Sequence, residues 1–138
     1  MGKKIQFETD EVIYEIGDAS NGAYIILSGH VDLFSKTGVR LTTLGEGEIF
    51  GEIGQIIGKS RSVTARARSK GTATFIPKEQ IIEKFEKADA AVKGIFRAVA
   101  VRLQHSNQDI EVLYEKYEKL RADNARLNAD LLRYKRSL

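Results

Sequence analysis

The chain has 138 residues, is 42% hydrophobic and 30% charged, and carries a formal net charge of +3 at neutral pH. That length supports one domain with a modest core, and so slight a charge gives no argument for nucleic-acid binding. The absence of cysteine excludes disulfides and thiolate metal sites, and no apolar stretch suits a membrane span or a signal peptide, so we expect a cytoplasmic protein with no membrane partner.

Residues up to about 76 are predicted to form short β-strands. Val12, Tyr14 and Ile16 recur at alternate positions, and a continuous apolar run follows at residues 24–27. The alternation returns at residues 31–33, 39–43 and 63–67, with glycine-containing turns at residues 28–30, 45–47 and 70–71. Short strands separated by such turns predict an antiparallel β-roll of the jelly-roll kind.

Helical patterns follow the strands, which assigns the chain to the α+β class. Pro77 precedes a short segment, residues 79–86, with apolar residues at helical spacing. Asp89 is a suitable N-cap for a second helix, and no proline follows it. Residues 89–138 are predicted to form one helix about 75 Å long, or two helices with a break near Ser106.

A heptad pattern covers the last 29 residues, from 110 to 138. A single asparagine at an a position, with leucine at most d positions, favours a parallel two-stranded coiled coil. Charge support is mixed, because Asp130 would attract Lys135 of a second chain whereas Lys116 would repel Arg121. The alternative is a long amphipathic helix packed on its own roll. The a positions are Ile110, Tyr117, Asn124, Leu131 and Leu138, and the d positions are Leu113, Leu120, Leu127 and Tyr134.

Residues 47–67 contain the most informative motif. Glycines allow close approach of the backbone, and a helical turn beginning near Glu52 would direct free N–H groups at an anion. Arg61 adds a planar fork of donors that matches phosphate oxygens. Glu52 only accepts hydrogen bonds, which suits a sugar hydroxyl. Together these groups fit a cyclic nucleotide, although Glu52 and Arg61 could instead form a buried ion pair within the roll.

This segment resembles the phosphate-binding cassette of the cyclic nucleotide-binding domain family, approximately F-G-E-[LI]-A-L, a short loop, then R-[STA]-A. The resemblance extends upstream through residues 17–18 and 23–29 and covers roughly residues 7–108. Gly54 replaces the usual alanine, and Ser60 stands where many members have proline. The matching residues, which the resemblance implies bind the ligand, are Phe50, Gly51, Glu52, Ile53, Gly54, Arg61 and Ser62.

In the catabolite-activator branch of this family, the long helix after the roll closes over the base and forms the dimer interface. Its pattern of Arg, Leu, Gln, any residue and two hydroxyl residues falls on residues 102–107. The resemblance implies roles for Arg102 and Ser106, whereas Asn107 differs from the second hydroxyl residue. Extending the heptads backward places Leu103 at a and Ser106 at d. We therefore hypothesise that a bound base orders this helix and biases the dimer.

Other functional classes have little support. His30 and His105 stand 75 residues apart, so no metal cluster or histidine-based catalytic triad is expected. The chain ends within the heptads, so no DNA-reading helix-turn-helix is expected. We predict a non-enzymatic sensor of cyclic AMP or cyclic GMP, without a cofactor, with a domain at residues 1–105 and a dimerisation helix at residues 106–138 that contacts a protein partner. The alternative is a ligand-independent dimeric adaptor, because rolls of this family exist that have lost their nucleotide.

Overall fold

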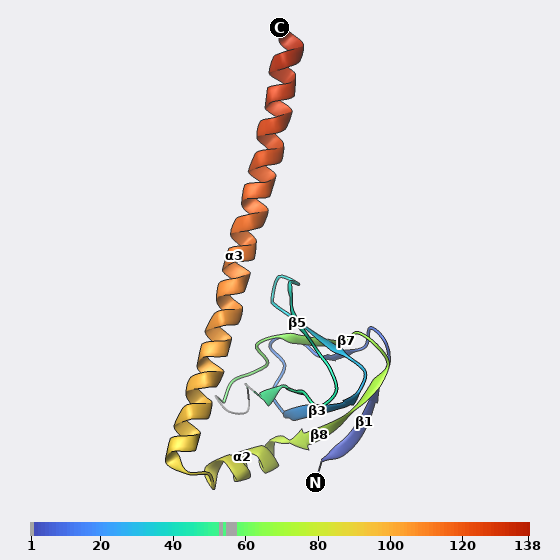
Figure 1. Ribbon diagram of the computed structural model, residues 1–138, viewed down its shortest axis with the longest axis vertical. Helices are drawn as coiled ribbons and strands as arrows, with labels where there is room; N and C mark the ends of the chain where they lie inside the picture. Colours follow the sequence, from blue (N-terminus) through green and yellow to red (C-terminus); the bar gives the residue numbers. More distant parts are fainter. Residues whose placement is uncertain (1, 53, 55–57) are drawn as a thin grey trace.

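The computed structural model describes residues 2–52, 54 and 58–138 and consists of two antiparallel sheets followed by helices (Figure 1). The antiparallel roll predicted from the sequence is thereby confirmed. One four-stranded sheet has the order β1 (Lys3–Phe7), β8 (Gly71–Pro77), β3 (Gly22–Ser28) and β6 (Ile49–Phe50). The other has the order β2 (Val12–Tyr14), β7 (Thr64–Ala67), β4 (Val31–Phe34) and β5 (Arg40–Leu44).

The core lies between the two sheets and is built from alternating strand positions. Phe7, Ile26, Val31 and Phe50 are its largest fully buried side chains. In β7 the two alanines point into this core while Arg66 between them is exposed, as the period of two predicts. The Arg66 guanidinium lies 4.6 Å from the centre of the Phe34 ring on the outer face of the sheet. Arg66 therefore lies on the solvated face of β7.

Two helices follow the roll in the described part of the chain. Helix α2 (Lys78–Glu86) begins directly after Pro77, and the Lys78 N–H donates to the Asn21 carbonyl oxygen at 2.9 Å. Helix α3 (Ala90–Ser137) is capped by the Asp89 carboxylate, which accepts from the Ala91 N–H at 2.8 Å. Of the two arrangements left open by the sequence, the structure has the single helix, which continues through Ser106.

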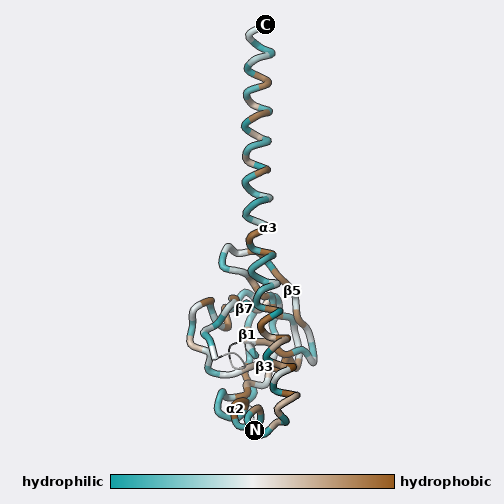
Figure 2. Tube along the Cα trace, turned by 90° about the vertical axis from the view of Figure 1, so that its left-hand side faces the viewer, coloured by the Kyte–Doolittle hydropathy of each residue, from teal (hydrophilic) through white to brown (hydrophobic). Residues whose placement is uncertain are grey.

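The first half of α3 lies along the roll, and its second half projects beyond it (Figure 1). Apolar residues recur along the projecting half in Figure 2. Leu113, Leu120 and Leu127 are each more than 60% exposed there. This exposed stripe is the predicted coiled-coil seam, and its pairing with a second chain stays a prediction. No helix in the described ranges is long and apolar enough to cross a membrane.

Candidate functional site

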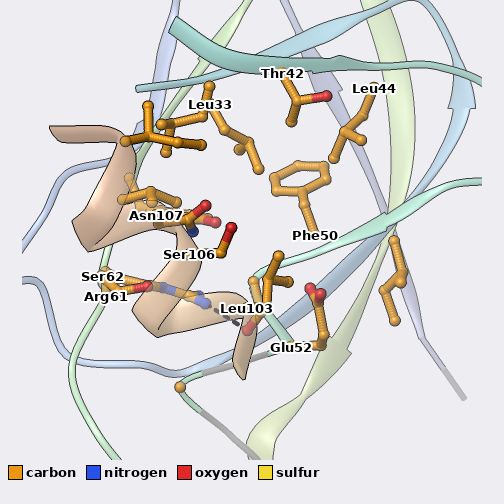
Figure 3. A pocket seen from close by; sticks show the side chains of 17 residues that line it. Leu33, Thr42, Leu44, Phe50, Glu52, Arg61, Ser62, Leu103, Ser106 and Asn107 are labelled. Carbon is orange, nitrogen blue, oxygen red and sulfur yellow. Dashed lines mark hydrogen bonds between the residues drawn. The ribbon is translucent and has the colours of Figure 1, made fainter. Parts of the chain in front are cut away.

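A cavity of about 380 Å³ lies between the roll and α3 (Figure 3). Phe50, Thr42 and Leu44 lie at one end of it, and Arg61 and Glu52 lie toward the other. Helix α3 closes one side. The lining residues are Tyr14, Leu33, Leu41, Thr42, Leu44, Ile49, Phe50, Gly51, Glu52, Gly54, Arg61, Ser62, Val63, Leu103, Ser106, Asn107 and Ile110.

Most of the predicted ligand-binding residues converge on this cavity. The cassette contributes Phe50, Gly51, Glu52, Gly54, Arg61 and Ser62, and α3 contributes Ser106 and Asn107. Arg102 is exposed and is not among the lining residues. Ile53 lies outside the described residues. Leu103 and Ile110, which the heptads assigned to the dimer seam, also line the cavity.

Several lining residues were not singled out as site residues in the sequence. Leu33, Leu41 and Thr42 come from β4 and β5, and Tyr14 comes from β2. The only signal for them was strand alternation, which places a residue on one face of a sheet without identifying what faces it. The β4–β5 hairpin brings Leu33, Leu41 and Thr42 to the cavity, and β2 brings Tyr14.

Arg61 is the buried cation of the site, with only 4% of its surface exposed. Its Nη1 donates to the Gly51 carbonyl oxygen at 2.9 Å, and its Nη2 donates to the Asn21 Oδ1 at 2.9 Å and the Gly22 carbonyl oxygen at 2.8 Å. The guanidinium carbon lies 4.1 Å from the centre of the Tyr14 ring. The buried Nε has no partner in the described part of the chain. The guanidinium is thus fixed, and two of its five N–H donors, the Nε–H and one Nη1–H, are not used by these hydrogen bonds.

Glu52 is half-buried in the same cavity. Burial raises the pKa of its carboxyl, while a backbone hydrogen bond and the charge of Arg61 act in the opposite direction. Neither Glu52 nor Arg61 belongs to an ion pair within the described ranges. The alternative of a buried ion pair between them therefore finds no support in the structure. The Arg61 guanidinium, which is a cation, and the Glu52 carboxylate, which accepts hydrogen bonds, are therefore separately available to a ligand.

The raised pKa of Glu52 predicts a pH dependence of stability that Glu52→Gln removes. The folded state holds the Glu52 proton more tightly than the unfolded state, so the contribution to stability is present below the ordinary pKa and is lost as pH rises through the raised pKa. The neutral amide has no such dependence. Chemical unfolding between about pH 4 and pH 7 should therefore show Glu52→Gln gaining stability relative to wild type as pH rises. Parallel stability curves for the two proteins would contradict this expectation.

Two cassette glycines bring the backbone close to other groups. Gly51 has φ +82°, and a Cβ built on it would lie 2.7 Å from the Arg61 Nη1. A Cβ on Gly54 would collide with the Ser20 hydroxyl and lie 2.7 Å from the Lys59 carbonyl oxygen. The departure from the family's alanine at position 54 therefore has a steric reason in this chain.

Gly51→Ala is expected to destabilise the fold more than Gly38→Ala. Gly38 has a similar φ of +84°, but a Cβ there meets nothing within 4 Å. Both substitutions incur the left-handed backbone cost of about 1–2 kcal/mol. Gly51→Ala also displaces the Arg61 guanidinium, which should add about 1.5–3 kcal/mol, the range for a hydrogen bond to a charged group. Chemical denaturation of both variants measures the difference, and equal losses would show that the Arg61 contact adds nothing.

No group of three or more potential metal ligands occurs within the described residues. Arg68 is half-exposed, its guanidinium lies 3.7 Å from the Asp32 carboxylate, and it is not among the residues that line the cavity. The cavity therefore offers an isolated cation, a carboxylate, two α3 polar side chains and an apolar wall. This combination fits a small organic anion that carries hydroxyl groups.

Solved structures of related architecture include the EAL enzyme Bd1971 with cyclic AMP bound. That protein is 34% identical, with a TM-score of 0.73, over 80% of this chain and 30% of the enzyme chain. Its form with cyclic GMP bound has a TM-score of 0.71 at 34% identity, over 78% of this chain and 30% of the other. The chain thus spans less than a third of that enzyme.

A more distant structure shows the fold alone. It is the CLP regulator from Xanthomonas campestris, described as responsive to cyclic di-GMP. It is 22% identical, with a TM-score of 0.57, over 79% of this chain and 55% of the regulator.

The family comparison covers the roll. The family model described as the cyclic nucleotide-binding domain matches residues 4–88, which run from the second residue of β1 through β8 and α2 and include the cassette. Domains of this family are generally regulatory and non-catalytic. The match extends over more than half of the sequence, and the chain therefore belongs to the cyclic nucleotide-binding domain family.

Proposed function

We propose that this chain binds cyclic AMP or cyclic GMP in the cavity beneath α3 and acts as a non-catalytic sensor. The observation that carries the proposal is the buried Arg61 guanidinium, which lines the same cavity as Glu52 and has no carboxylate bonded to it. A buried cation that is bonded to no carboxylate favours an anionic ligand, because attraction is stronger where water is largely excluded.

The phosphate and the sugar would occupy the cassette end of the cavity. Arg61 would bind the phosphate through its charge and its free Nε donor, and Ser62 beside it would add a hydroxyl. Glu52 would accept from a ribose hydroxyl, and its carboxylate disfavours placing the phosphate on that side. The two side chains would thereby orient the ligand as well as hold it.

The base would extend toward the apolar end, against Leu33 and Leu44. Ser106 and Asn107 project from α3 beside this space, and Thr42 adds a hydroxyl from β5 (Figure 3). These three side chains offer donors and acceptors to the edge of a purine. Bd1971, which is related in structure, has been solved with each of the two nucleotides, so both belong in the binding test.

The regulatory output would pass through α3. Leu103, Ser106 and Ile110 line the cavity and also occupy a or d positions of the heptads. A ligand that contacts them would order the part of α3 that continues into the projecting stripe. We infer that the stripe pairs with a second copy as a parallel coiled coil and that this dimer contacts a protein partner, so nucleotide binding would shift the dimer equilibrium.

Calorimetric titration of the full chain with cyclic AMP and cyclic GMP tests the proposal, with the oligomeric state followed by light scattering in the same samples. Saturable binding of at least one nucleotide, with a stoichiometry of one per chain, is the expected result. Binding of neither nucleotide by a folded dimer would favour the ligand-independent adaptor instead. The exposed apolar stripe on α3 is the feature that such an adaptor would use.

A further inference from the structure

Asn21 connects the cation of the site to the start of α2. It precedes β3, and its side-chain Oδ1 accepts from the Arg61 Nη2 at 2.9 Å. Its own carbonyl oxygen accepts from the Lys78 N–H at 2.9 Å, where α2 begins. The backbone of Asn21 is thereby tied down, which holds the amide oxygen in place against the guanidinium.

Among the residues that the structure describes, every oxygen bonded to the Arg61 guanidinium is neutral. Two are the backbone carbonyls of Gly51 and Gly22, and the third is the amide oxygen of Asn21. The ring of Tyr14, which faces the guanidinium, belongs to a buried phenol whose pKa is raised by burial, so its hydroxyl is neutral as well. The nearby Asp18 carboxylate accepts from the Glu15 N–H at 2.9 Å and is engaged in its own turn.

We propose that Asn21 is a positioning residue that holds the Arg61 fork while leaving its charge available to the ligand. The inference rests on the proposed function of the cavity. An aspartate at this position would have nearly the same shape and could accept the same hydrogen bond from Nη2. It would also place a full negative charge on the guanidinium and repel a bound phosphate. The amide therefore determines how strongly this pocket attracts anions.

A trade-off between stability and anion binding follows from this assignment. A buried guanidinium that is satisfied only by neutral acceptors is less stable than one that faces a carboxylate on an exposed loop, where the carboxylate loses little hydration. Asn21 is such an exposed residue. The chain thus has lower stability and higher affinity for an anion than it would have with an acid at this position.

The test compares Asn21→Asp and Asn21→Ala with wild type in the full chain, by thermal unfolding without ligand and by calorimetric titration with cyclic AMP and cyclic GMP. Asn21→Asp should raise the Tm by a few degrees and weaken nucleotide binding about tenfold to fiftyfold, as expected for a negative charge added beside the cation that binds the phosphate. Asn21→Ala should lower the Tm and weaken binding by less than about tenfold, because the two carbonyls still hold the guanidinium.

In Asn21→Asp, a higher Tm together with weaker nucleotide binding would show that Asn21 controls the charge of the site and does not act only as a structural residue. A merely structural side chain would change stability and binding in the same direction. A Tm for Asn21→Asp at or below that of wild type would overturn the inference whether or not nucleotide binds, and so would nucleotide binding as tight as that of wild type. If wild type bound neither nucleotide while the Tm still rose, the proposed function would fail and the assignment of the uncompensated charge would stand.

Discussion

Arg61→Ala should reduce cyclic nucleotide affinity by about 2–5 kcal/mol, the range for removing one partner of a buried charge pair. Arg61 is the buried cation lining the cavity, and its Nε–H and one Nη1–H are not used by its hydrogen bonds to the described residues. Calorimetry would detect the change as a loss of roughly thirtyfold to several thousandfold in affinity. Thermal unfolding must accompany it, because the substitution also removes three hydrogen bonds that join Gly51, Asn21 and Gly22.

Two further variants separate the charge of Arg61 from its geometry and from general effects. Arg61→Lys keeps the charge and loses the planar fork, so its affinity should fall between those of wild type and Arg61→Ala. Arg66→Ala removes another arginine that lies over an aromatic ring, on the exposed face of the sheet. It should bind as wild type does. Undiminished binding by folded Arg61→Ala would contradict the placement of the phosphate at this residue.

Leu127→Glu should convert the proposed dimer to a monomer at concentrations where wild type is dimeric. Leu127 occupies a d position in the projecting half of α3 and is 63% exposed in the single chain. The substitution removes one leucine from each side of the seam, at about 1.5–3 kcal/mol for each, and places two carboxylates opposite one another. The dimer dissociation constant should rise at least about a hundredfold. Analytical ultracentrifugation over a range of concentrations measures it.

Leu132→Glu provides the matched control for this experiment. Leu132 is also a leucine of the projecting half of α3, with 56% exposure, but it occupies a b position outside the seam. Leu132→Glu therefore changes charge and helix propensity as Leu127→Glu does, but on a helix face that stays exposed to solvent in the predicted coiled coil. The variant should remain dimeric. Equal dissociation by both variants, or wild type that is monomeric throughout, would exclude the predicted register.

The elements that the sequence predicted are those whose signals are local in the chain. The alternation around Arg66 predicted the solvent face of β7, and Asp89 before an uninterrupted helical stretch predicted the start of α3. The cassette could be recognised because Glu52 and Arg61 stand at a short, characteristic spacing in one loop. In each case the residues that make the pattern are neighbours along the chain, so backbone periodicity and spacing suffice.

Contacts between residues that are far apart in the sequence could not be predicted from such local patterns. Asn21 and Arg61 are 40 residues apart, and nothing in the sequence indicates that the amide oxygen would accept from the guanidinium. Tyr14 and Thr42 reach the cavity from two other strands. A period of two identifies which face of a sheet a side chain lies on, but the strand order and register determine what it meets there.

In helix α3, some features follow from the sequence alone and others depend on the tertiary structure. The heptads alone determined that a continuous apolar stripe runs along it, because a helix repeats its faces at a fixed interval. Tertiary structure decided what lies against each part of that stripe. Leu103 and Ile110 line the cavity, whereas Leu113 and Leu120 lie on the exposed, projecting part of the helix. The physical reason is that periodicity is a property of the helix itself, while the environment of each turn depends on how far the roll extends beside it.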